Sequence, residues 1–272
     1  MASVKKYRNK WLKYHKGYEK KSLNALMKVF KSYNEIVIAT DLNINDYKEQ
    51  IANAVKIDSL IDAYYSIYYF IGATHGQRVG KDINLNLKEF TFESFMELFQ
   101  TELELYFRQL GFNRIQLVHQ SYLEDIYRLF NDNMKAGMTF KETTDEIHRL
   151  MRSPRFYRWQ AERIARTETT AAANYAAIQS GRVTGFVMEK QWISAQDART
   201  RRKPKADYDH YFMNGKRVGL KEKFLFNPNS LNIDQLEYPG DPKGQAGNII
   251  NCRCTVAVVP KRDKNGNLIR IS

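Results

Sequence analysis

The sequence predicts an α+β fold, in which a long-helix N-terminal half is followed by a compact C-terminal domain of helices and a small β-sheet. Up to residue 137, apolar side chains recur every three or four positions, which is the spacing of one helix face. After Gly185 the pattern changes to short β-type runs at residues 186–193 and 255–259, separated by loops rich in Gly, Asn, Pro and Asp. We therefore expect a helical region at 1–137 and a second domain at 138–272.

Four helices are expected in the N-terminal half. Apolar residues at helical spacing cover residues 11–37, 51–71, 92–110 and 115–130. Glycines punctuate these runs, because a glycine weakens a helix interior and favours its end. We expect Gly72 to Gly80 to end or loosen the second helix, Gly111 to close the third, and Gly137 to lie just after the fourth.

Two further helices are expected before the sheet. Thr139 and Glu142 have the spacing of a capping box, in which each side chain satisfies a free backbone donor of the other, and the helix that they start is expected to run to Met151. Ser153 followed by Pro154 suits a cap and the first position of the next helix. That helix is expected to end at Gly181.

The charge balance points to a polyanionic partner. The chain of 272 residues has a net charge of +13 and a pI near 9.5, which favours nucleic acid or an acidic protein surface. Basic residues gather at the N-terminus and again in a run after residue 199. The candidate nucleic-acid contacts are Lys5, Lys6, Arg8, Lys10, Arg201, Arg202, Lys203 and Lys205. A solvated basic loop that meets acidic protein is the alternative for the second run.

Membrane and secretory signals are missing from the sequence. No window approaches the roughly 18 uninterrupted apolar residues of a membrane span, and the N-terminus lacks the apolar core of a signal peptide. We therefore expect no membrane span and synthesis in a cytoplasm. The two cysteines are one residue apart, which excludes a disulfide framework.

Cys252 and Cys254 form the strongest candidate for a metal site. An extended strand places both thiols on one face, where they could bind one ion, and zinc takes about four N, S or O ligands. His210 and Asp197, with Asp207 or Asp209 as alternatives, could complete the set. The competing interpretation is that the cysteines are reduced and buried, and pack as small hydrophobic residues.

A second group of polar residues follows Trp192. Asp197, Arg199 and Arg201 have the spacing of an Asp–Arg network that holds a loop in place. Acid–base catalysis would need a second converging carboxylate, which the sequence does not identify. The common phosphate-binding, dinucleotide-binding, esterase and metalloprotease motifs are also missing from the sequence.

Taken in order, these pieces resemble a known family. The pieces are Arg166-Thr167-Glu168, Trp192, Asp197 with Arg199 and Arg201, His210, the turn Tyr238-Pro239-Gly240-Asp241-Pro242, and Cys252-Arg253-Cys254. Over about Met138 to Pro260 they look like the minor head protein domain of tailed bacteriophages, called Mu F-like or the phage head morphogenesis domain. The chain departs from the family pattern at residues 203–209, which separate His210 from the Asp/Arg group.

The resemblance implies a minor capsid protein of the virion, inside the head and bound at the portal vertex, which assists head assembly, DNA packaging or DNA delivery. Its implied partners are the portal protein, packaged double-stranded DNA and other capsid proteins. We expect it not to be an enzyme, and we expect the matched residues to form a structural motif. The alternatives are a metal-stabilised nucleic-acid-binding protein and an enzyme, either a nuclease or an ADP-ribosyltransferase that uses Arg166, Thr167 and Glu168.

Overall fold

The computed structural model describes residues 4–84, 90–228 and 231–271. The chain folds into two compact units that we call unit 1 and unit 2. Unit 1 comprises Met1–Ser22, Ile67–Leu105 and Arg163–Ser272, and unit 2 comprises Leu23–Ser66 and Tyr106–Glu162. Each unit draws residues from both sides of position 137, and the separate roles expected for the two halves of the sequence stay a prediction.

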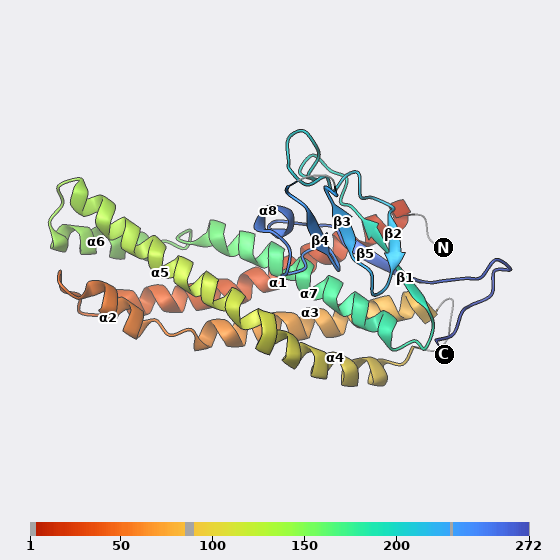
Figure 1. Cartoon of the computed structure of the whole chain (residues 1–272). Helices are drawn as coiled ribbons and strands as arrows, with labels where there is room; N and C mark the ends of the chain where they lie inside the picture. The colour runs from red at the N-terminus through yellow and green to blue at the C-terminus, as the bar shows by residue number, and fades with distance from the viewer. Residues whose placement is uncertain (1–3, 85–89, 229–230, 272) are drawn as a thin grey trace. The chain divides into compact units, whose positions relative to one another are not determined.

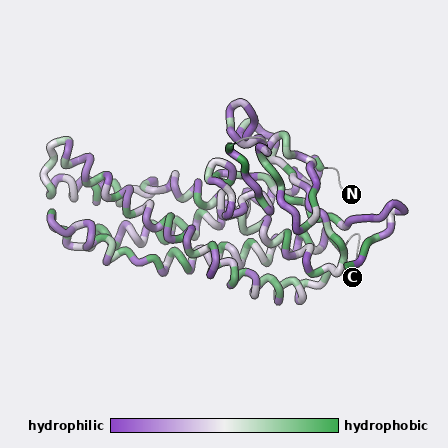
Figure 2. The backbone as a smooth tube through the Cα atoms, viewed as in Figure 1, coloured by the Kyte–Doolittle hydropathy of each residue, from purple (hydrophilic) through white to green (hydrophobic). Residues whose placement is uncertain are grey.

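The predicted α+β class is confirmed, with helices first and a small antiparallel sheet near the C-terminus (Figure 1). The helices up to residue 151 are α1 (Val4–Ala39), α2 (Tyr47–Ala54), α3 (Asp58–Asn84), α4 (Phe92–Tyr106), the π-helix η1 (Phe107–Gly111), α5 (Phe112–Lys135) and α6 (Phe140–Met151). The backbone coloured by hydropathy shows hydrophobic and hydrophilic residues alternating along them (Figure 2). Among the described helices, none combines the length and the hydropathy needed to cross a bilayer.

The second expected helix differs from its prediction in two ways. It begins as the separate helix α2, which ends before Val55, and α3 then continues through Gly72, Gly76 and Gly80 to Asn84. A Cβ atom at Gly72 would overlap the ring of Phe99, and one at Gly76 would overlap the ring of Phe95. These glycines are therefore positions of close packing against aromatic rings and do not end the helix.

Two predicted helix boundaries were wrong. Gly111 does not close a helix, because it has helical angles and joins η1 directly to α5. The helix expected to start at Pro154 starts at Arg158 instead, as α7 (Arg158–Arg182). Tyr157 before it has a φ of 60°, and this left-handed conformation interrupts the helical backbone.

Other predicted boundaries are confirmed. Gly137 has a φ of 94° and follows Ala136, the cap residue of α5, as expected of a glycine that ends a helix. Thr139 and Glu142 form the capping box at the start of α6, and that helix ends at Met151. The last residue of α7 is Arg182, one position after the expected Gly181.

The sheet of unit 1 has three antiparallel strands in the order β2-β1-β5. They are β1 (Met188–Ile193), β2 (Arg217–Gly219) and β5 (Thr255–Pro260), and Trp192 pairs with Val256. Strands β3 (Phe224–Phe226) and β4 (Asp234–Leu236) form a separate hairpin, and the short helix α8 (Ala246–Ile249) precedes β5. Every residue of β5 except its last is buried, so this strand lies in the interior of unit 1.

Candidate metal centre

Helix α7 presents a polar face to the chain that leads into β5. The first residue of this face is Thr167, whose hydroxyl accepts a hydrogen bond from the backbone N–H of Asn251 at 3.0 Å. Arg166 donates to the side-chain oxygen of Asn251 at 2.9 Å and forms an ion pair with Glu19 at 2.8 Å. These bonds fix Asn251, whose φ of 60° turns the chain into Cys252. Asparagine adopts this left-handed conformation more readily than most residues.

Asn174 is the central residue of this face. It is fully buried, and its side-chain NH2 donates to the carbonyl oxygens of Thr170, Pro239 and Cys254. Its side-chain oxygen accepts from the Thr255 hydroxyl at 2.8 Å and from the Val256 N–H at 2.9 Å. One amide group therefore joins α7 to β5 and to the turn at residue 239.

Thr170 and His15 support the same segment from inside. The Thr170 hydroxyl donates to the carbonyl oxygen of Cys252, so its oxygen accepts from His15 Nε2 at 3.0 Å. Burial, and secondarily the charges of Arg253 and Arg166, lower the pKa of His15 to about 3. His15 is therefore neutral near pH 7 and acts as a hydrogen-bonding core residue.

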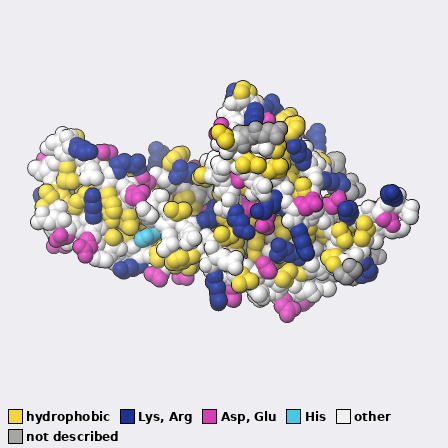
Figure 3. Space-filling view, in the orientation of Figure 1, with side chains coloured by type: hydrophobic (Ala, Val, Ile, Leu, Met, Phe, Trp, Pro, Cys, Tyr) yellow, Lys and Arg dark blue, Asp and Glu magenta, His cyan; other side chains and the backbone are white. Residues whose placement is uncertain are grey.

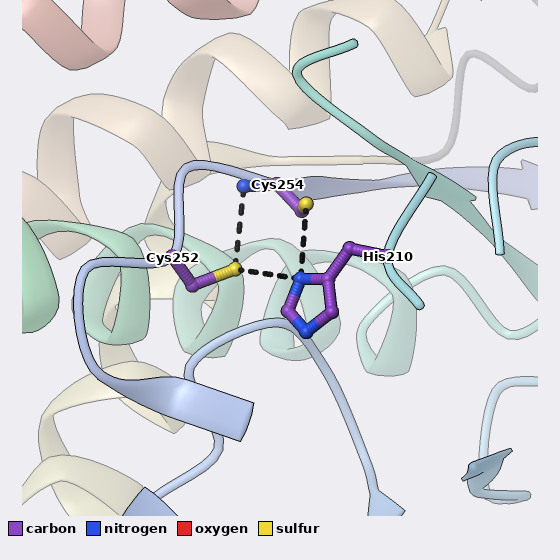
Figure 4. A group of neighbouring side chains, drawn as sticks. All are labelled: His210, Cys252 and Cys254. Atoms are coloured by element: carbon purple, nitrogen blue, oxygen red, sulfur yellow. Dashed lines mark hydrogen bonds between the residues drawn. The ribbon is translucent and has the colours of Figure 1, made fainter. Parts of the chain in front are cut away.

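The candidate metal ligands His210, Cys252 and Cys254 come together in this interior (Figure 4). One ligand atom from each lies within 4.8 Å of the other two. The Nδ1 atom of His210 is 3.5 Å from both sulfur atoms. The side chains are 1–2% exposed and the cysteines are not bridged. Such a set of one imidazole and two sulfurs suits a borderline-soft ion such as zinc.

Hydrogen bonds orient the histidine for this role. The Asn248 NH2 donates to Asp234 at 2.8 Å, so its side-chain oxygen faces His210 Nε2, which lies 2.6 Å away. This network assigns the proton of His210 to Nε2 and leaves the lone pair of Nδ1 directed between the two sulfurs. Metal-binding histidines usually have such a partner on the second ring nitrogen.

The two thiols have opposite ionisation tendencies. Burial alone raises the pKa of Cys252, but hydrogen bonding with Cys254 and the proximity of His210 hold it well below its usual value. Burial and the neighbouring Cys252 raise the pKa of Cys254. The backbone N–H of Cys254 also points at Cys252 Sγ, at 3.4 Å. These groups thus favour a thiolate at Cys252, the form that binds metal.

Asp197 does not belong to the group of ligand atoms that the described residues bring together. Its two carboxylate oxygens each accept a bond of 2.6 Å from the guanidinium of Arg253. The predicted Asp–Arg pairing within the loop is thus replaced by a pairing with Arg253. Arg199 contributes its backbone N–H to Asp197, and Arg201 donates to the carbonyl of Ile250. Asp197 and Arg201 thus connect the loop to the chain around Cys252, whereas the bond of Arg199 stays within the loop.

Trp192 and the turn at residues 238–242 complete the surroundings. Trp192 is fully buried in β1, and its ring lies edge-on against His210 at 5.4 Å and against Phe224 at 5.2 Å. In the turn, Gly240 has a φ of 82°, and a Cβ atom there would lie 3.0 Å from the Ala171 nitrogen. Asp241 is buried, which raises its pKa, and its carboxylate accepts from the N–H groups of Glu237 and Lys243. Pro239 contributes the carbonyl bound by Asn174, and Pro242 follows the turn.

Glu168 of the expected motif has a different partner from Arg166 and Thr167, which both bind Asn251. It is 3% exposed and accepts a hydrogen bond of 2.7 Å from the Tyr68 hydroxyl. Arg166, Thr167 and Glu168 all lie on α7. All three are therefore helix residues whose side chains bind partners within the fold.

The first predicted basic segment contacts the loop that carries the second. Arg8 donates to the side-chain oxygen of Gln196 at 2.6 Å, which places the start of α1 beside the base of the loop between β1 and β2. Lys10 is paired with Asp82 at 2.7 Å. The predicted contacts with exposed side chains are Lys5, Lys6, Lys10, Arg202, Lys203 and Lys205.

Sequence reasoning missed several residues that build the centre: Asn174, Thr170, Asp234 and Asn248. Asn174 stands among alanines on a helix, where an amide favours other conformations unless it has partners. That contrast was a usable signal. Asp234 and Asn248 gave no such signal in the sequence, because their roles depend on a turn that brings β4 and α8 together.

Comparison with known protein families matches part of the chain. Residues 124–257 match the family model described as phage Mu protein F like protein. The matched segment runs from within α5 to within β5, and it includes every residue of the candidate metal centre. No curated protein and no solved structure matches the chain.

Proposed function

We propose that this chain, a phage head-related protein by its match to the phage Mu protein F-like family over residues 124–257, is a minor capsid protein bound at the portal vertex inside the head. In this position it assists head assembly, DNA packaging or DNA delivery. Its partners are the portal protein, other capsid proteins and packaged double-stranded DNA.

The observation that carries this proposal is the agreement between the family match and the buried polar network of α7. Arg166, Thr167, Thr170 and Asn174 all bind the chain around Cys252 and β5, and all lie inside the matched segment. A network that fixes backbone in this way supports a structural role. The net charge of +13 and the exposed basic residues support contact with DNA.

Co-purification tests the proposal. The tagged protein is produced together with the portal protein and with the other head proteins, and heads are separated on a gradient. We expect the protein in the head fraction and in a complex with the portal. Recovery with neither would refute the portal-vertex role.

We also propose that the His210, Cys252 and Cys254 cluster binds zinc, which stabilises unit 1. The supporting observation is the Asp234–Asn248–His210 chain, which directs the Nδ1 lone pair at both sulfurs. Zinc sites with a structural role have four protein ligands, so a further side chain outside this set would supply the fourth. The burial of the cluster, with side chains 1–2% exposed, favours a structural ion over a catalytic one.

Metal analysis of the purified protein tests this second proposal. About one equivalent of zinc is expected in the native protein, and much less in a Cys252→Ser, Cys254→Ser double variant. Thermal unfolding with and without a chelator supplies the second measurement, because bound metal stabilises the folded state. Zinc below about a tenth of an equivalent would favour reduced cysteines that pack as hydrophobic residues.

We propose, finally, that the protein does not act as an enzyme. Support comes from Glu168, the carboxylate that a transferase reaction would need, which is buried on α7 and bound to Tyr68. Nuclease and NAD-glycohydrolase assays on the native protein and on Glu168→Gln should give the same background. Activity that is lost in Glu168→Gln would support the enzyme instead.

A further inference from the structure

The loop between β1 and β2 carries two exposed aromatic side chains in succession. Tyr211 is 39% exposed and Phe212 is 67% exposed, whereas Tyr208 and His210 of the same loop are buried. The loop extends beyond the sheet of unit 1 in Figure 1, and hydrophobic and basic side chains lie next to one another over it in Figure 3. The buried side chains of Tyr208 and His210 account for the packing of the loop. They do not explain why the rings of Tyr211 and Phe212 are exposed.

Each exposed ring has a cation over it. The guanidinium of Arg202 lies 3.6 Å from the ring centroid of Tyr211, and Lys216 Nζ lies 4.2 Å from that of Phe212. The exposed Lys203 and Lys205 belong to the same loop. Aromatic faces stack with nucleobases and cations bind phosphate groups, so the two types together match the two parts of a nucleotide.

Hydrogen bonds within the loop fix the backbone that carries both rings. One oxygen of Asp209 accepts from the Phe212 N–H at 2.8 Å, and the other accepts from the Lys203 N–H at 3.3 Å. The Tyr211 N–H donates to the Arg201 carbonyl at 3.1 Å. A loop that is already ordered loses little conformational entropy when it binds a ligand. The charge of Asp209 is also engaged in these internal bonds.

We propose that this loop binds single-stranded nucleic acid, with unpaired bases stacked on Tyr211 and Phe212 and phosphates beside Arg202, Lys203 and Lys216. The inference rests on the proposed contact with packaged DNA and adds that unpaired stretches are the preferred ligand. A duplex presents its phosphates at the surface while its base faces stay stacked inside, so it would use the cations and leave the rings unused.

Fluorescence anisotropy on the full-length protein tests the inference. The probes are a labelled DNA oligonucleotide and its duplex. Native protein should bind the single strand more tightly. Phe212→Ala should weaken single-strand binding roughly fivefold or more and leave duplex binding unchanged. Phe212→Trp, which keeps an aromatic ring at this position, should bind the single strand about as tightly as the native protein. Leu225→Ala, which removes a 42% exposed side chain from β3, is the matched control and should change neither affinity.

Salt dependence separates the role of the rings from that of the charges. Arg202→Gln should lower the slope of log affinity against log salt by about one, because one phosphate contact is lost. Phe212→Ala should leave that slope unchanged, because it removes no charge. Unchanged thermal midpoints would show that both variants are folded.

Each outcome of this experiment has a defined meaning. Equal affinity for both probes, with no effect of Phe212→Ala, overturns the single-strand inference and leaves the proposed DNA contact intact. Binding to neither probe overturns both, whereas the portal-vertex role is judged separately by co-purification. If Phe212→Ala abolishes capture of the portal protein and leaves both DNA affinities unchanged, the loop is a protein-docking surface and the inference fails.

Discussion

Both units pack aromatic rings in their interiors, but unit 1 also buries a hydrogen-bonded polar face of α7. In unit 2, aromatic rings pack together: the ring centroids of Phe30 and Tyr157 are 4.6 Å apart, and those of Tyr122 and Tyr157 are 5.1 Å apart. In unit 1, the rings of Phe95 and Phe99 also pack, with centroids 5.3 Å apart. Helix α7 in addition buries Thr167, Thr170 and Asn174, each of which has specific hydrogen-bond partners. An apolar interior tolerates substitutions that conserve volume. A polar interior requires each partner, because a buried group left without a hydrogen bond is costly.

This comparison predicts its largest effect at Asn174. Asn174→Ala should lower the free energy of unfolding by about 3–5 kcal/mol, because it leaves the Val256 N–H, the Thr255 hydroxyl and several carbonyls without their present partner. Urea denaturation followed by circular dichroism measures the change. Asn24→Ala, at an exposed position on α1, is the control and should change stability little. A loss below about 1 kcal/mol at Asn174 would mean that this network is not needed for stability.

Lys190 tests whether every buried polar group of unit 1 stabilises the fold. It is 1% exposed in β1, and burial lowers its pKa from 10.5 to about 8, against the opposing influence of Glu237 and Asp241. Below pH 8 the folded state must hold a charge that water stabilises in the unfolded chain. This cost disappears as the pH rises toward 10.5.

Lys190→Met should therefore stabilise the protein at pH 7, by about 2–3 kcal/mol. The advantage over the native protein should shrink between pH 8 and pH 10. Urea denaturation at several pH values measures it. A difference that stays constant with pH would show that Lys190 keeps an ordinary pKa in the fold.

Two glycines with positive φ separate backbone strain from close packing. Gly240→Ala should cost about 2–3 kcal/mol, because it adds a contact with the Ala171 backbone to the strain of a left-handed alanine. Gly137→Ala has the same type of strain, but a Cβ atom there meets nothing within 4 Å, so we expect about 1 kcal/mol. Thermal unfolding of both variants measures the difference. Equal effects would show that the contact with the Ala171 backbone adds nothing to the cost of Gly240→Ala.

The smallest effect is expected at the capping box of unit 2. Thr139→Ala should cost about 1 kcal/mol, since it removes the acceptor of the Glu142 N–H. The Thr139 N–H and hydroxyl hold the pKa of Glu142 below its usual value. The hydrogen bonds that the Glu142 carboxylate accepts from Thr139 should therefore weaken as the pH falls through that lowered pKa. Circular dichroism between pH 7 and pH 3 should show a larger loss of helix in native protein than in Thr139→Ala. Parallel curves would contradict a role for Glu142.

The same comparison explains how far the sequence predicts the fold. Periodicity located the aromatic interior of unit 2 and most helices, because such packing repeats with the helix. It failed at Gly72 and Gly76, where the absence of a side chain serves a neighbouring ring. It also failed at Tyr157, because a left-handed tyrosine is rarely adopted.

The candidate site was predicted only in part, for a similar reason. Cys252 and Cys254 were recognisable from their spacing, and His210 as an isolated ligand type, and the structure brings the three together. Asp197 was assigned to them by residue type, but the guanidinium of Arg253 binds it at 2.6 Å on both oxygens. Which of several carboxylates lies near a sulfur depends on the path of a long loop, and the sequence does not specify that path.

The hydrogen bonds of Trp11 have a consequence for folding during synthesis. Trp11 donates to the carbonyl of Arg253 at 2.8 Å, and Tyr7 donates to that of Val256 at 3.1 Å, so the earliest helix depends on nearly the last strand made. A ribosome delivers every residue of unit 2 by Glu162 but completes these acceptors about ninety residues later. Unit 2 can therefore fold first, while the first turns of α1 cannot make these bonds until β5 has been synthesised.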